Sequence, residues 1–191
     1  MKGKIYNMNL LNAFGLLNMI NESKADYQEE YKNYVEEHKD RVKQFAEWLR
    51  GQLHEVFEGI DFDDFNELIQ EHDESKFSEP EFEAYAQHFY GPTKNNKNDF
   101  EFEEAWKHHW THNEHHPEFW LGEDMPYIYI LEMICDWGSF SIASGDFREL
   151  IDFYYTKAKD DEEKNLSDNT KAIIEEILEK INSVLEAERK E

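Results

Sequence analysis

The sequence predicts an all-α protein built around one main domain. Apolar residues recur at steps of three and four over most of the chain, which places them on one face of a helix. No segment alternates apolar and polar residues with the two-residue period of a β-strand. The 191 residues are 39% hydrophobic and 15% aromatic, which is enough to fill a packed core.

The sequence predicts two helices in the first part of the chain, a short one and a long one. A short helix is expected over residues 8–20, with its apolar residues on one side, and the polar residues 21–24 follow it. A longer helical pattern covers residues 27–58 and ends at Gly59. We interpret residues 1–26 as an N-terminal helical extension that packs on the main body or on a second copy of the chain in a homodimer.

The middle of the chain predicts three further helices. One covers residues 62–72, and the next is opened by the Glu79-Pro80 pair, because proline suits the first turn of a helix. Residues 91–98 are rich in Gly, Pro, Asn and Lys, which indicates an exposed loop. A helical pattern over residues 102–113 follows and is broken at Pro117.

Two helices are expected after that break. An apolar helix lies within residues 125–144 and starts after Pro126. Residues 168–188 form a clean amphipathic pattern, and Ser167 or Asp168 could cap its start. This last segment carries no histidine, so we assign it a structural role.

Charge narrows the range of partners. The formal net charge is −24, from 44 acidic and 20 basic residues. Such a surface repels phosphate backbones and anionic lipids, so we expect neither non-specific nucleic-acid binding nor membrane binding. A small anionic substrate, such as a nucleotide, would need bound cations or a local Lys or Arg. The acidic residues could also serve only to keep the protein soluble.

Cysteine usage and hydropathy indicate a cytoplasmic protein. Cys135 is the single cysteine, so no disulfide can form within the chain. The longest apolar stretch, residues 10–20, is too short to span a membrane.

Histidines and carboxylates form the most informative pattern. Two of the nine histidines, His38 and His72, lie in the register of apolar helix positions, and Asp73 directly follows His72. Asp136 lies on another apolar helix, where a carboxylate is costly unless it is paired, protonated or bound to a cation. Together they suggest a mixed nitrogen and oxygen site for a first-row divalent metal. Each histidine could instead be an ordinary hydrogen-bonded core residue.

The other notable feature is a histidine cluster between Trp106 and Trp120. Pairs four residues apart would share one helical face, but not all five could reach one ion. The alternative is a polar helix end whose histidines are partly solvated. The members of the cluster are His108, His109, His112, His115 and His116.

The order of these residues resembles a known superfamily. His38, then the adjacent His72-Asp73 pair, then Asp136 is similar to the HD superfamily of helical metal-dependent phosphohydrolases, which is named after that pair. Lys76 continues the pair as HD-x-x-K, as in branches of the superfamily that bind two metals. The resemblance implies an HD-domain-like helical bundle over residues 27–160, with the metal site between helices. The segment 161–191 would add a C-terminal amphipathic helix packed on this domain.

A longer set of motifs resembles an uncharacterised family of phage and bacterial proteins. The family pattern reads EHK, HDxSKFS, AWxHHxxNxHHPEYW, MP and EMxCDW, and the resemblance covers about residues 31–145. No established activity comes with it. The matching segments here are Glu37–Lys39, His72–Ser78, Ala105–Trp120, Met125–Pro126 and Glu132–Trp137.

The superfamily resemblance also implies a role for each residue. One or two divalent ions (Fe, Mn, Co, Ni or Zn) would be bound, and Asp73 would bridge them. Lys76 would meet the negative charge of the substrate. The first ion would take His38, His72, Asp73 and Asp136, and the second would add His109 and one of His115 or His116.

Three functions fit this pattern. The leading one is a metal-dependent phosphohydrolase acting on a phosphomonoester or phosphodiester of a nucleotide-like small molecule. The same ligands would serve a diiron oxygenase of HD-like fold. The third is a non-enzymatic, metal-stabilised phage or bacterial interaction protein, for which the acidic surface and the amphipathic end helices would be suited.

Overall fold

The computed structural model describes residues 3–92 and 100–189, with side chains from residue 23 onward. Throughout these ranges the regular structure is helical and there is no strand, as the periodicity predicts. Three 3₁₀ turns, η1 (His54–Phe57), η2 (Glu74–Phe77) and η3 (Pro117–Trp120), and one π-turn, η4 (Tyr154–Ala158), connect the helices. The helices are α1 (Gly3–Gln52), α2 (Phe62–Glu71), α3 (Glu81–Tyr90), α4 (Phe100–His112), α5 (Tyr127–Ile142), α6 (Arg148–Phe153) and α7 (Asp168–Glu188).

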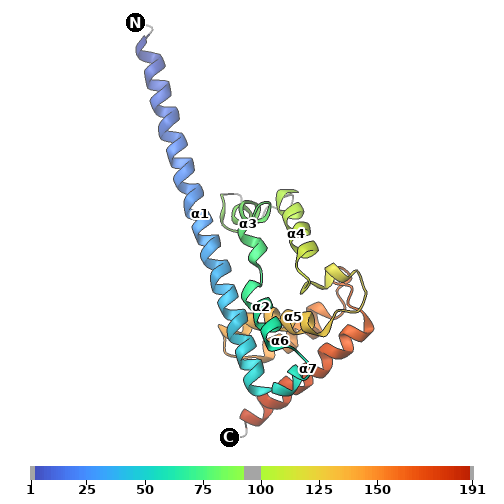
Figure 1. The fold of residues 1–191 in the computed structure, drawn as a ribbon. Coiled ribbons are helices and arrows are strands. Elements are labelled where there is room, and N and C mark those ends of the chain that lie inside the picture. Colours follow the sequence, from blue (N-terminus) through green and yellow to red (C-terminus); the bar gives the residue numbers. More distant parts are fainter. Residues whose placement is uncertain (1–2, 93–99, 190–191) are drawn as a thin grey trace.

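The longest element, α1, corrects the prediction of two separate helices. It runs without a break through residues 21–24, because that stretch contains no glycine or proline and polar residues are tolerated on an exposed helix. It ends at Gln52 rather than at residue 58, since Leu53 leaves the helical region. Figure 1 shows that the N-terminal half of α1 extends well beyond the other helices.

The main core forms where α5 packs against α1, and α7 closes its far side. Ten of the sixteen residues of α5 are buried, as expected of a helix that is apolar on nearly every side. Gly138 allows the close approach of α1, because a Cβ atom there would lie 2.4 Å from the ring of Phe45. Cys135 is buried and has no disulfide partner.

A second, smaller core lies between α1, α3 and α4. It includes Tyr31 and Val35 of α1, Tyr85 of α3 and Ala105 of α4. The next turn of α1 carries His38, and Val42 beyond it belongs to the main core. The polar centre described below therefore lies between two apolar clusters.

The bounds of the other predicted helices agree closely with the observed ones. Ser167 caps α7 by accepting a hydrogen bond from the Thr170 backbone N–H, at 3.0 Å. The short α6 and the π-turn after it are not predicted by periodicity. Most of the predicted loop at 91–98 lies outside the described residues. Among the helices described, none is both long enough and apolar enough to cross a bilayer.

Candidate metal centre

The side chains singled out from the sequence converge on one place between the helices. α1 contributes His38, α4 contributes His109 and α5 contributes Asp136. The other four come from irregular segments, where the backbone can turn side chains inward. These are His72 and Asp73 after α2, and His115 and His116 before η3.

The local backbone explains how adjacent residues both reach the centre. The sequence places His72 on the apolar face of a helix, but α2 ends at Glu71 and His72 is its C-cap. Asp73 then adopts the left-handed conformation (φ 59°, ψ 15°), which aspartate tolerates better than most residues. On a continuous helix, neighbouring side chains point about 100° apart. The turn removes this constraint and directs both side chains inward.

Asp73 divides the centre into two clusters. Its Oδ2 lies 3.3 Å from His38 Nε2 and 3.6 Å from His72 Nε2. Its Oδ1 faces the other way, 3.2 Å from His109 Nε2 and 3.7 Å from His115 Nε2. The side chain is only 1% exposed, so all of these groups meet away from bulk water. One carboxylate thus presents one oxygen to each cluster.

The first group, which we name the outer cluster, consists of His38, His72, Asp136 and Asp73 Oδ2. His38 Nε2 lies 3.4 Å from His72 Nε2 and 3.1 Å from Asp136 Oδ1. Two atoms bound to one ion at about 2.1 Å lie about 3.0 to 3.4 Å apart in octahedral or tetrahedral geometry. The separations among His38, His72 and Asp73 are therefore close to those of ligands that share one cation, and Asp136 lies beside them.

The second group, which we name the inner cluster, consists of Asp73 Oδ1 and the Nε2 atoms of His109, His115 and His116. Their ligand atoms all lie within 4.8 Å of one another. Each of these four atoms is buried and has no hydrogen-bond partner outside the cluster. An unsatisfied buried polar atom is costly, and four that face one another fit a bound cation. Both His115 and His116 are present, where the sequence left the choice between them open.

Two buried glutamates accept hydrogen bonds from the Nδ1 atoms of these imidazoles, on the side away from the clusters. Sequence reasoning missed both of them. Glu132 on α5 accepts from His72 Nδ1 at 3.0 Å and from His115 Nδ1 at 3.2 Å. Glu81 on α3 accepts from His109 Nδ1 at 2.9 Å. With Nδ1–H donating outward, each Nε2 lone pair points inward, which is the usual arrangement around a metal.

Comparison with known proteins places the chain in a family. A model described as a family of unknown function (DUF5662) matches residues 27–180. The chain belongs to this family. No curated protein and no solved structure matches the chain. The matched range contains every residue of both clusters.

Electrostatics in this DUF5662 chain favour protonated histidines when no cation is bound. Burial lowers the pKa of His72, but the adjacent carboxylates, Asp73 first, outweigh it and raise the pKa to about 10. The same balance raises the pKa of His38, beside Asp136 and Asp73, and that of His109, beside Asp73. These protons supply the positive charge that the buried carboxylates require.

The carboxylates and His116 shift in the opposite direction. Burial raises the pKa of Asp73, but the charge of Lys76 and the neighbouring histidines outweigh it and hold the pKa well below its usual range. Hydrogen bonds from His38 and His72 do the same for Asp136. Burial, followed by the charges of neighbouring histidines, lowers the pKa of His116 well below its usual range. His116 is therefore neutral, which is the form that binds metals.

The two clusters have different residues at their solvent side. In the inner cluster the four ligand atoms are buried, and the His116 side chain is 13% exposed. The outer cluster opens where the Asp136 side chain is 16% exposed, and Lys76 beside it binds Asp73 Oδ2 at 2.6 Å. Two exposed aromatic rings, Tyr34 and Phe140, lie next to the imidazole of His38. A small molecule could thus approach the outer cluster at Asp136.

Proposed function

We propose that this protein is a metal-dependent phosphohydrolase that uses one or two divalent first-row metal ions. The observation that carries the proposal is Asp73, which presents one oxygen to each of two buried clusters of imidazole nitrogens. Carboxylates that bridge two ions in this way are typical of sites for hydrolytic phosphoryl chemistry. The order of His38, His72-Asp73 and Asp136 along the helices supports an HD-like arrangement.

The chain's own residues would divide the work between them. Bound ions would supply an acidified water and would neutralise charge on the phosphoryl oxygens. Asp73 would contribute one oxygen to each cluster, and Glu132 and Glu81 would orient the imidazoles. Lys76, at the solvent side of the outer cluster, would attract an anionic phosphoester. A chain with a net charge of −24 needs such a local cation.

The substrate we propose is a small phosphomonoester or phosphodiester with a nucleotide-like aromatic group. The exposed rings of Tyr34 and Phe140 beside His38 support this size and chemistry. A cytoplasmic location is also proposed, because the free Cys135 suits a reducing compartment.

The first test combines metal analysis with hydrolysis. Protein purified without chelator is analysed for metals and assayed with p-nitrophenyl phosphate and bis-p-nitrophenyl phosphate. Asp73→Ala is expected to remove both metal and activity, because it takes an oxygen from each cluster. Lys76→Ala should retain the metal and raise KM. The exposed Lys180→Ala serves as the control and should change neither.

Two outcomes would contradict the hydrolase. A metal-free chain that also takes up no added Mn²⁺, Zn²⁺ or Fe²⁺ would refute both the site and the activity. A metal-loaded chain that hydrolyses neither ester, nor any nucleotide offered to it, would leave the metal site and refute the reaction. That result would favour the metal-stabilised interaction protein.

A diiron oxygenase is the second candidate, and the inner cluster gives the reason. It combines three imidazoles with one carboxylate oxygen, a nitrogen-rich set that suits iron. Iron near two equivalents, with oxygen uptake that depends on an added substrate and no phosphate release, would favour this reaction over hydrolysis.

A further inference from the structure

A small apolar pocket of about 260 Å³ lies between α5 and α6. Three aromatic side chains line it, Trp137 and Phe140 of α5 and Phe153 of α6. The rings of Trp137 and Phe153 meet edge to face, with their centroids 5.4 Å apart. Phe140 is 57% exposed, so this wall of the pocket is in contact with solvent. A planar ring fits such a lining, because aromatic rings pack well edge to face or offset on one another.

Two polar side chains line the same pocket, and each restricts what can bind there. Ser141 is 1% exposed, and its Oγ is buried without a hydrogen-bond partner. A hydroxyl can both donate and accept, and leaving it unpaired when buried is costly, so a ligand with a hydrogen-bonding group would stabilise it. Glu149 is exposed, and its Oε2 accepts a hydrogen bond from Ser144 Oγ at 2.9 Å. This carboxylate would repel an anionic group in the pocket.

Phe140 joins this pocket to the outer cluster of the metal centre. The centroid of its ring lies 5.6 Å from that of the His38 imidazole. Asp136, the partly exposed member of the outer cluster, is four residues before Phe140 on α5, so both lie on one side of the helix. Trp137 and Ser141 each follow one of these two residues and lie about 100° further around the helix. The pocket therefore adjoins the outer cluster across the ring of Phe140.

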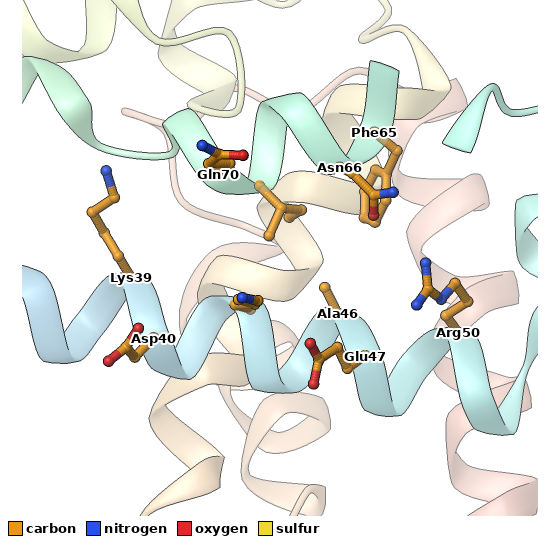
Figure 2. Close-up of a pocket in the computed structure, with 10 residues that line it drawn as sticks. Lys39, Asp40, Ala46, Glu47, Arg50, Phe65, Asn66 and Gln70 are labelled. Atoms are coloured by element: carbon orange, nitrogen blue, oxygen red, sulfur yellow. The ribbon is translucent and has the colours of Figure 1, made fainter. Parts of the chain in front are cut away.

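A larger hollow of about 420 Å³ between α1 and α2 has no comparable selectivity (Figure 2). Its lining mixes the carboxylates of Asp40 and Glu47 with the cations of Lys39, Lys43 and Arg50. None of its lining residues has a buried polar atom without a partner. The pocket between α5 and α6 is smaller, but its lining specifies both a shape and a chemistry.

We propose that the pocket between α5 and α6 binds the aromatic ring of the substrate, a neutral ring with a hydrogen-bonding group that pairs with Ser141. This inference rests on the proposed phosphohydrolase, because it makes the ring part of the phosphoester whose phosphate lies at the outer cluster. The ring must be neutral, since three apolar side chains would desolvate a charge and Glu149 would repel an anion. The phosphate itself would stay on the Asp136 side of Phe140, near Lys76.

The first test measures binding of the ring alone, which needs no hydrolysis. The full chain is titrated with 4-fluorophenol and with fluorobenzene, and binding is followed by ¹⁹F NMR. We expect saturable binding of both, with 4-fluorophenol the tighter ligand because its hydroxyl can pair with Ser141. Ser141→Ala should weaken 4-fluorophenol about threefold or more and leave fluorobenzene nearly unchanged. Ser141→Leu should abolish binding of both, because the larger side chain fills the pocket.

Matched substitutions at Ser183, an exposed serine of α7, provide the control. Ser183→Ala and Ser183→Leu should change neither affinity. Thermal melts establish that each variant is folded, and Ser141→Ala still tests the pocket if Ser141→Leu does not fold. Equal affinity of the unmodified chain for the two probes, or affinities that Ser141→Ala and Ser141→Leu leave unchanged, would overturn the proposal.

The second test links the pocket to the substrate. On metal-loaded protein, Ser141→Leu should raise KM for 4-fluorophenyl phosphate by about tenfold and leave KM for methyl phosphate and the metal content unchanged, because methyl phosphate has no ring. Equal changes for both esters, or none for either, would show that the pocket does not hold the ring of the substrate. Binding of 4-fluorophenol without hydrolysis of either ester would refute the proposed reaction and leave a site for a free aromatic molecule.

Discussion

Glu132 shows how much one buried side chain can control. It accepts hydrogen bonds from His72 of the outer cluster and from His115 of the inner cluster. Neighbouring histidines outweigh the effect of burial and lower its pKa, so it stays ionised. A single carboxylate therefore sets the tautomer of one ligand in each cluster, and any change to it is felt by both.

Glu132→Gln is expected to weaken metal binding at both clusters while the protein remains folded. Both imidazoles contact the same oxygen, Oε1, so the amide oxygen can still accept both hydrogen bonds, but it lacks the negative charge of the carboxylate. Loss of that charge makes both imidazoles less basic ligands, and changes to such partners typically cost about 10- to 100-fold in metal affinity, so we expect a loss of about tenfold. Competition with a chromogenic chelator measures this directly.

The control for this variant is Glu123→Gln, an exposed glutamate in the loop before α5. It should leave metal affinity unchanged. Equal affinities for the Glu132→Gln and Glu123→Gln proteins would show that Glu132 has no positioning role.

The sequence was informative for the proposed metal ligands and uninformative for the glutamates that accept hydrogen bonds from their imidazoles. Asp136 stood out because a carboxylate on an apolar helix requires a partner, and Asp73 stood out because it directly follows His72. Glu81 did not, since acidic residues are ordinary in the first turn of a helix. Glu132 could have been found, because it lies four residues before Asp136 on the same face of an apolar helix.

The elements that carry the two clusters differ. The outer cluster depends on α1 and α5, whose facing side chains leave Asp136 partly exposed. The inner cluster depends on α4 and the turn that follows it; its ligand atoms are buried, and the His116 side chain is 13% exposed. Asp73, in the turn after α2, is common to both.

This difference predicts two rates of metal loss, on the proposal that two ions bind. When a loaded protein is mixed with excess EDTA, the outer ion should leave faster than the inner ion, because all four ligand atoms of the inner cluster are buried, whereas the outer cluster includes the partly exposed side chain of Asp136. Asp136→Asn should remove the fast phase alone, and His109→Gln should remove the slow phase. Loss of both ions in one phase would contradict the assignment.

Periodicity was a good guide to elements and a poor guide to where they join. The apolar faces of α2, α5 and α7 are regular, and the predicted ranges lie close to the observed ones. The two helices predicted for the first part of the chain are one helix, α1, because polar residues at 21–24 do not end a helix when that stretch contains no glycine or proline. The left-handed turn at Asp73 depends on tertiary packing, which no local pattern contains.

For the molecule as a whole, the metal centre couples stability to pH. Without metal, His38, His72 and His109 have raised pKa values, and Asp73 and Asp136 have lowered ones. The histidine contribution is complete below the unfolded pKa of about 6.5 and is lost as pH rises through the folded values. The aspartate contribution is present above about pH 4 and is lost below it. The metal-free centre is therefore most stabilising in mildly acidic solution.

A bound divalent ion should reverse this dependence, because it must displace the histidine protons. Apparent affinity is expected to rise by up to about tenfold per pH unit for each proton released, and the rise in Tm on adding metal should be larger at pH 8 than at pH 6. Differential scanning calorimetry with and without metal measures the second effect. Titration calorimetry in two buffers of different ionisation enthalpy counts the protons released. A metal-induced rise in Tm that is the same at both pH values, with no proton release, would mean that the ion does not bind at these histidines.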